Sequence, residues 1–176
     1  KATWEFESLA MYYSDHELAH INKELYGIED FFSMAEVPNV IDVWDRIDKQ
    51  TGETRHIPKF ELHRICGVVL EKVKNWDSVR LLTEQGVVLV KIGKGAFSHY
   101  DRNISFKDEE TGKNVVVDGS WLKKGTLLFA HGYRDGDIFR CKNYKNSLYS
   151  HTIYKIDKVY EDGIVGIVEE RQLIDE

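Results

Sequence analysis

Residues 61–92 read ELHRICGVVLEKVKNWDSVRLLTEQGVVLVKI and contain the pattern from which the fold class is predicted. Its apolar residues are mostly valine, leucine and isoleucine, and polar residues interrupt them at 74–77 and at 84–86. This pattern predicts a long strand over 61–73, followed by a hairpin of two strands at 77–83 and 87–92. Gly67 falls inside the long strand, where a glycine predicts a bulge or a bend.

Short strands are predicted on both sides of this stretch. After Pro38 the apolar residues alternate with polar ones, which predicts a hairpin with strands near 41–47 and 55–57 and a turn at 49–52. Further strands are predicted at 115–121, 126–133, 138–144 and 152–159, and residues 93–114 are expected to connect two of them. Strands at this spacing are typical of a closed or sandwiched all-β fold. We predict a mainly β chain with a five-stranded OB-type barrel, because its first strand is long and bent. An immunoglobulin-like sandwich is the alternative.

The two ends of the chain differ from this middle part. Apolar residues in 4–33 recur at helical spacing, Ser14 and Glu17 fit a capping box, and Gly27 fits a helix C-cap. This part is too short to be a globular domain and is expected to pack on something else. We therefore divide the chain into a helical extension (1–39), a hairpin or linker (40–60), the barrel (61–160) and an acidic C-terminal segment (161–176).

The composition fits one globular domain with an uneven charge distribution. The chain has 176 residues, of which 42% are apolar, and a net charge of −6. Cys66 and Cys141 lie in strand-like runs, where buried thiols are expected in a reducing compartment. No apolar run is long enough for a membrane span and no signal peptide is evident, so we expect a cytoplasmic location. Residues 90–158 carry 13 basic and 8 acidic residues, whereas 1–60 carry 6 and 12 and 159–176 carry 1 and 6.

The basic middle of the chain also contains clustered aromatic residues. Cations that follow phosphates and aromatic rings that stack on bases are what a protein needs to bind single-stranded nucleic acid. In 139–144 the alternation places Arg140, Lys142 and Tyr144 on one face, which is the expected binding surface. The predicted DNA-binding residues are Lys91, Lys94, Tyr100, Arg102, Arg134, Arg140, Lys142 and Tyr144.

Two short motifs suggest other chemistry, and we discount both. His16-Glu17-Leu18-Ala19-His20 has the H-E-x-x-H spacing of a zinc site. Metalloproteases with the extended form of this motif have a glycine and a histidine further along, and the corresponding positions here hold Lys23 and Tyr26. Gly93-Lys94-Gly95 lacks the lysine–serine/threonine pair of a phosphate loop and is expected to be a turn. We therefore expect no metal, no cofactor and no catalytic residue, and keep a zinc hydrolase as a minor alternative.

Four stretches in order resemble a known family. They are LLTEQGVVLVK (81–91), GAFSHYDRNIS (95–105), SWLKKG (120–125) and GYRDGDIF (132–139). Together they resemble the C-terminal OB region of the bacterial replicative DNA polymerase III alpha subunit, particularly in Gram-positive bacteria and their phages. Residues 7–18 are similar to the helical stretch E-x-L-G-x-Y-x-S-G-H-P-L upstream of that region, with Asp15 and Glu17 where the family has glycine and proline.

The resemblance implies an accessory role. The catalytic aspartates of that family belong to a palm domain that this chain does not contain, so the resemblance implies a non-enzymatic part of a DNA polymerase. It implies that the barrel binds single-stranded template DNA and contacts other domains of the polymerase and other replisome proteins, at the nucleoid in the cytoplasm. The sequence starts without methionine, which is expected of a fragment of a longer protein. A module that binds only proteins is the alternative.

Overall fold

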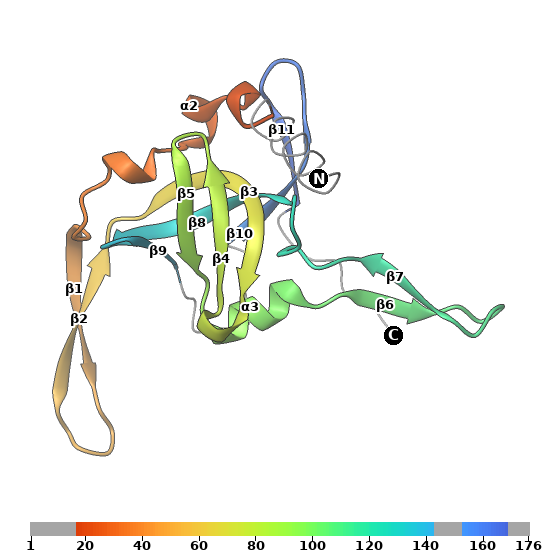
Figure 1. Cartoon of the computed structure of the whole chain (residues 1–176). Helices are drawn as coiled ribbons and strands as arrows, with labels where there is room; N and C mark the ends of the chain where they lie inside the picture. The colour runs from red at the N-terminus through yellow and green to blue at the C-terminus, as the bar shows by residue number, and fades with distance from the viewer. Residues whose placement is uncertain (1–16, 143–152, 169–176) are drawn as a thin grey trace.

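Five strands close into a barrel in the computed structural model, which describes residues 17–142 and 153–168 (Figure 1). The strands are β3 (His63–Val73), β4 (Ser78–Thr83), β5 (Gly86–Lys91), β8 (Leu127–Asp135) and β9 (Ile138–Cys141). Antiparallel ladders join β3 to β4, β4 to β5, β8 to β9 and β3 to β8, and a parallel ladder between β5 and β9 closes the barrel. The predicted OB-type barrel is confirmed, and the sandwich alternative is wrong.

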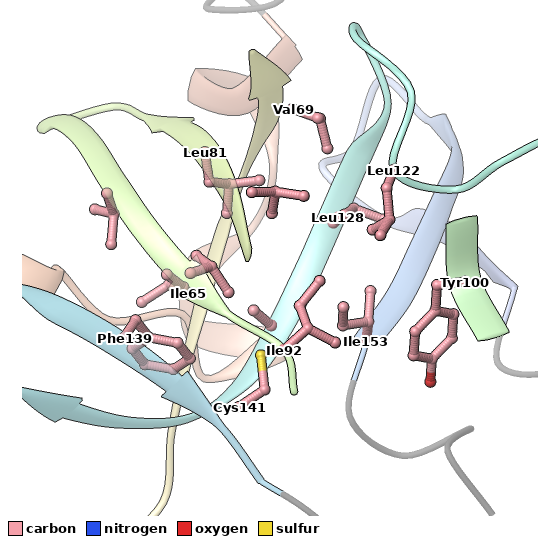
Figure 2. Close-up of a cluster of buried hydrophobic side chains, with 14 of the residues drawn as sticks. Ile65, Val69, Leu81, Ile92, Tyr100, Leu122, Leu128, Phe139, Cys141 and Ile153 are labelled. Atoms are coloured by element: carbon pink, nitrogen blue, oxygen red, sulfur yellow. The ribbon is translucent and has the colours of Figure 1, made fainter. Parts of the chain in front are cut away.

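The alternation of side chains along each strand separates the core from the surface. In β5, Val88 and Val90 are buried while Lys91 is half-buried, and in β9 Phe139 and Cys141 are buried between half-buried neighbours. Figure 2 shows Phe139 and Cys141 together with Ile65 of β3 and Ile92. Full burial of such side chains contributes about 1.5–3 kcal/mol each. The core therefore fixes which face of each strand points outward.

Gly67 marks a close approach of two strands, which corrects the predicted bulge. A Cβ atom there would lie 2.6 Å from the backbone oxygen of Leu82, so β3 and β4 pack too tightly for a side chain. The irregularity in the β3–β4 ladder lies instead between Val69 and Glu71.

The connection between β5 and β8 begins with a helix, α3 (Lys94–Asp101). The expected turn at Gly93-Lys94-Gly95 is therefore wrong, because residue 94 already begins the helix. Ala96, Phe97 and Tyr100 of α3 are buried in the barrel core. The predicted strand to residue 121 is too long, since β7 (Asn114–Asp118) ends earlier and Trp121 stacks on Tyr100 with 5.4 Å between ring centroids.

Residues before the barrel pack against it. Residues 17–20 are helical, α2 spans Lys23–Tyr26, and a 3-10 turn, η1, spans Phe31–Ser33. Gly27 caps α2 at φ 64°, which confirms the predicted C-cap. The predicted helix is interrupted at residues 21–22, and the capping box at Ser14 lies outside the described residues. Among the residues that the structure describes, no helix is long and apolar enough to cross a membrane.

Two hairpins project from the barrel on different sides (Figure 1). One is the predicted hairpin, formed by β1 (Val40–Ile47) and β2 (Thr54–Phe60). The other joins β6 (Ile104–Lys107) to β7. A 3-10 turn, η2 (Lys74–Trp76), links β3 to β4.

β10 (Ile153–Val159) pairs with β8 and with β11 (Val165–Val168), so part of the segment expected to be an acidic tail belongs to the sheet.

Candidate nucleic-acid interface

One row of side chains crosses the outer surface of the barrel. Lys91 on β5 pairs with Arg140 on β9, and Arg140 pairs with Tyr133 on β8. Directly paired residues of neighbouring strands project to the same side, about 4.8 Å apart in the direction across the strands. All three are half-buried, and their sequence neighbours Val90, Phe139 and Gly132 are buried, so the row faces outward.

An aromatic side chain lies at each end of this row. Trp76 in η2 is 55% exposed, and the ammonium of Lys91 lies 5.9 Å from the centroid of its ring. At the other end the ring of Phe60, the last residue of β2, lies 4.6 Å from that of Tyr133. We call Trp76, Lys91, Arg140, Tyr133 and Phe60 the barrel row. Two cations are thus flanked by three aromatic rings.

The electrostatics of the row leave Arg140 able to bind an anion. The Arg140 Nε donates to Asp135 Oδ2 at 2.7 Å, in a pair whose side chains are 38% and 48% exposed. Such exposed pairs contribute about 0–1 kcal/mol, so a phosphate can compete with Asp135 for the guanidinium. Burial raises the pKa of Tyr133, an effect that Asp135 reinforces and Arg140 opposes, and the phenol stays a neutral hydrogen-bond donor.

A second group of basic side chains adjoins the row. The Lys142 backbone N–H donates to the His131 oxygen at 2.9 Å, which places Lys142 beside β8. Partial burial and the nearby charge of Lys59 on β2 lower the pKa of Lys142. Burial, Arg64 and Lys142 lower the pKa of His131. The charge of Lys59 on β2 therefore lies near Lys142, and the charges of Arg64 on β3 and of Lys142 lie near His131 on β8.

Three predicted site residues lie in this region. Lys91 and Arg140 are in the barrel row and Lys142 is next to it. The predicted alternation in 139–142 is confirmed, because Phe139 and Cys141 are buried and the two basic residues face outward.

Two predicted residues have structural roles instead. Tyr100 is completely buried against Trp121, so it cannot stack on a base, and its selection was wrong. Arg134 points in the opposite direction from Tyr133 and donates to three backbone oxygens, those of Gly136 at 2.8 Å, Phe31 at 3.1 Å and Met34 at 3.0 Å. Its side chain is 11% exposed, so Arg134 attaches η1 to the barrel.

The other three predicted residues are not brought into the row. Arg102 is exposed but follows α3, outside the strands that carry the row. Lys94 begins α3, and the position of its side chain is not described. Tyr144 lies outside the described residues, as does His16 of the H-E-x-x-H motif, whose partner His20 is exposed.

The sequence analysis missed Trp76, Phe60 and the pairing of Tyr133 with Arg140. Trp76 had a usable signal, because a tryptophan in the turn KNWD has no place in the strand alternation and is therefore expected at the surface. Phe60 had no such signal, because its contact with Tyr133 joins residues far apart in the chain.

Comparison with known proteins relates the chain to DNA polymerases. It is 40% identical over 168 residues to a probable DNA polymerase, YorL, of Bacillus subtilis strain 168, and equally to a DNA-directed DNA polymerase of Bacillus phage SPbeta. The match covers 96% of this chain and 12% of each relative. The chain is thus homologous to a small region of these polymerases. No family model matches it, and no solved structure matches it.

Proposed function

We propose that this chain is an accessory domain of a replicative polymerase of the DNA polymerase III alpha type, and that its barrel row binds single-stranded template DNA. The observation that carries the proposal is the arrangement of two cations between an exposed ring, Trp76, and two half-buried rings, Tyr133 and Phe60, on the outside of an OB-type barrel. The face formed by the second and third barrel strands, with the loops after the first and fourth strands, is where this fold binds oligonucleotides. Here those elements are β4, β5, η2 and the turn between β8 and β9. Trp76 and Lys91 of the barrel row lie on them, whereas Tyr133 and Arg140 lie on the two strands that the turn joins.

The chemistry of each residue defines its role in the proposal. Lys91 and Arg140 neutralise phosphates, with Arg140 exchanging Asp135 for a phosphate oxygen. Trp76 stacks on a base, which contributes about 1–3 kcal/mol for an aromatic ring in such sites. Tyr133, supported by Phe60, forms a second stacking surface. The proposal gives each residue of the row a binding role and assigns the chemistry of synthesis to other parts of the polymerase.

Fluorescence anisotropy with labelled oligo-dT tests the proposal. We expect binding at low salt that weakens as salt rises, with log K falling by about 0.7 per log unit of salt for each phosphate contacted. The double variant K91Q/R140Q should therefore lower the slope by about 1.4. The absence of binding at low salt, or a variant slope equal to that of the wild type, contradicts the proposal.

A matched control is available on the other side of the molecule. Lys107 and Lys113 lie on the β6–β7 hairpin and are exposed, so K107Q/K113Q removes the same charge without touching the row. Its slope should equal that of the wild type. A drop as large as that of K91Q/R140Q would show that only the total charge matters.

A second candidate function has one observation in its favour. Phe106 and Val116 on the β6–β7 hairpin are 43% and 55% exposed, and Val115 next to Val116 is 41% exposed. Exposed apolar side chains of this kind are typical of contacts between proteins. We propose that this hairpin contacts another domain of the polymerase or a replisome protein. The variant F106S/V116S should lose co-purification with the rest of the polymerase while its oligo-dT affinity stays unchanged.

A further inference from the structure

The β1–β2 hairpin has two faces of different chemistry. The register pairs Asp42 with Lys59, Trp44 with Ile57, and Arg46 with Arg55, so these six side chains share one face. The other face carries Val43 with Pro58, Asp45 with His56, and Ile47 with Thr54. Asp45 and His56 are joined by a 2.5 Å contact. The first face has three basic residues and one acidic residue, and we call it the hairpin face.

Two arginines lie directly opposite each other on the hairpin face. Arg46 and Arg55 are both exposed, and neither side chain has an ion pair or a hydrogen bond to any residue in 17–142 or 153–168. Like charges directly opposite each other on a ladder destabilise it. An anion between the two guanidinium groups would remove that repulsion.

The surroundings of this arginine pair fit a phosphate and a base. Arg46, Lys49 and Arg55 line a hollow of about 550 Å³ near the tip of the hairpin. One acidic residue, Asp48, also lines the hollow, and its side chain accepts from the Gln50 backbone N–H at 2.9 Å. Trp44 lies one step further along the same face and is 55% exposed.

The hairpin face continues into the basic part of the barrel. Lys59 lies at the barrel end of this face, close enough to Lys142 for its charge to lower the pKa of Lys142. Phe60, the next residue, lies against Tyr133 of the barrel row. From Arg46 to Asp42, which pairs with Lys59, the strand covers four residues, or about 14 Å at ~3.4 Å each.

We infer that the hairpin face is a second DNA contact that extends the path of the single strand beyond the barrel row. The strand runs from Lys91 and Arg140 past Lys142 and Lys59 to the arginine pair, where Arg46 and Arg55 hold one or two phosphates and Trp44 stacks on a base. Charge complementarity and continuity with the barrel row select this occupant. The inference rests on the proposed function, because the same strand must occupy the row.

Oligonucleotide length separates the two contacts. OB folds occupy roughly 4–16 nucleotides, so we compare oligo-dT of about 8 nucleotides with oligo-dT of about 20. With the full chain, R46Q/R55Q should leave the affinity for the short oligonucleotide within about twofold. With the long one it should lower the affinity and reduce the salt slope by about 0.7–1.4, the value for one or two phosphates. K107Q/K113Q is the charge-matched control and should change neither the affinity nor the salt slope for either oligonucleotide.

A second variant, W44A, tests the stacking contact separately, and the melting temperature shows whether the variants are folded. W44A should weaken only the long oligonucleotide, by about 5- to 150-fold for one stacked base, and leave the slope unchanged. Removal of the arginine pair should leave the melting temperature equal or higher, because the repulsion is gone. If the wild type binds both lengths with one affinity and neither variant changes the long one, the hairpin contact is wrong and the barrel row stands. If the wild type binds neither length, both proposals fail. Tighter binding of a duplex than of the long single strand would also overturn the inference.

Discussion

Aromatic side chains lie both inside the barrel and on its outer surface, and the two groups have different consequences. Tyr100, Trp121 and Phe139 are at most 1% exposed and pack in the core, whereas Trp76 is 55% exposed beside Lys91. The residue types are the same, so composition does not separate them. What separates them is the strand alternation and the position of α3. The buried rings therefore contribute to the stability of the barrel, whereas the surface rings are available for binding.

The largest expected difference is in stability between two tryptophans. Trp121→Ala should lower the free energy of unfolding by about 3–5 kcal/mol, because it leaves a large cavity beside Tyr100. Trp76→Ala should change it by no more than about 0.5 kcal/mol, since that ring is mostly exposed. Urea unfolding followed by circular dichroism measures both. Equal losses for the two variants would contradict the division into inner and outer rings.

The next difference is between two arginines on the adjoining strands β8 and β9. Arg134→Ala should cost about 2–3 kcal/mol of stability, because the oxygens of Phe31 and Met34 lose a charged donor. Arg140→Ala should cost at most about 1 kcal/mol, because its pair with Asp135 is exposed. The same urea titration measures this contrast. Oligo-dT binding measured over a salt series should show the opposite order. Only Arg140→Ala should lower the slope of log K against log salt, under conditions in which both variants are folded.

A smaller effect concerns DNA affinity. Trp76→Ala should weaken oligo-dT binding by about 1–3 kcal/mol, the value of one stacked base. Tyr133→Phe is the control, because it keeps the ring against Phe60 and removes only the hydroxyl, and its affinity should stay within about twofold. Anisotropy at fixed salt measures both variants. An unchanged affinity for Trp76→Ala would remove the tryptophan from the site.

The smallest expected effect is the loss of stability when an ion pair is removed, and it differs between the pairs of Asp101 and Asp135. Asp101 accepts from Lys72 Nζ and Ser120 Oγ, both at 2.8 Å. Burial raises the pKa of Asp101, but these two hydrogen bonds and the charge of Lys72 outweigh it and hold the pKa below 3.8. A carboxyl group with a lowered pKa stabilises the fold above its unfolded value, and the stabilisation is lost as the pH falls through its folded value.

Asp101→Asn should therefore cost about 1 kcal/mol at neutral pH. The difference from the wild type should shrink as the pH falls below 3.8, and thermal unfolding across that range measures it. A constant difference down to the lowest pH would contradict this role for the carboxylate. Asp135→Asn, in the exposed pair with Arg140, should lower the free energy of unfolding at neutral pH by less than Asp101→Asn does.

The sequence predicted the parts of the fold that depend on local pattern. The strand pairs around residues 84–86 and 49–52 and the outward face of Arg140 and Lys142 follow from alternation and turn residues. The helix α3 could also have been predicted, since Ala96, Phe97 and Tyr100 are spaced as on one helical face. A prediction that lacks this helix puts Tyr100 at the surface, whereas the helix buries it.

The site itself depends on contacts between distant segments. The row joins Lys91, Arg140 and Tyr133 only because β9 inserts between β5 and β8, with a parallel ladder on one side. The charge of Arg134 predicts a surface role, but its actual role depends on backbone oxygens about a hundred positions earlier in the chain. Neither the insertion of β9 nor the contacts of Arg134 can be predicted from the local sequence pattern.

The central claim, that single-stranded DNA lies on the barrel row, is tested most directly by photocrosslinking. Oligo-dT with 5-iodouracil in place of thymine is bound to the full chain and irradiated, and the crosslinked peptides are identified by mass spectrometry. We expect crosslinks at Trp76 and Tyr133, and their loss in K91Q/R140Q at moderate salt. Crosslinks confined to the β6–β7 hairpin, or a pattern that K91Q/R140Q leaves unchanged, would contradict the account.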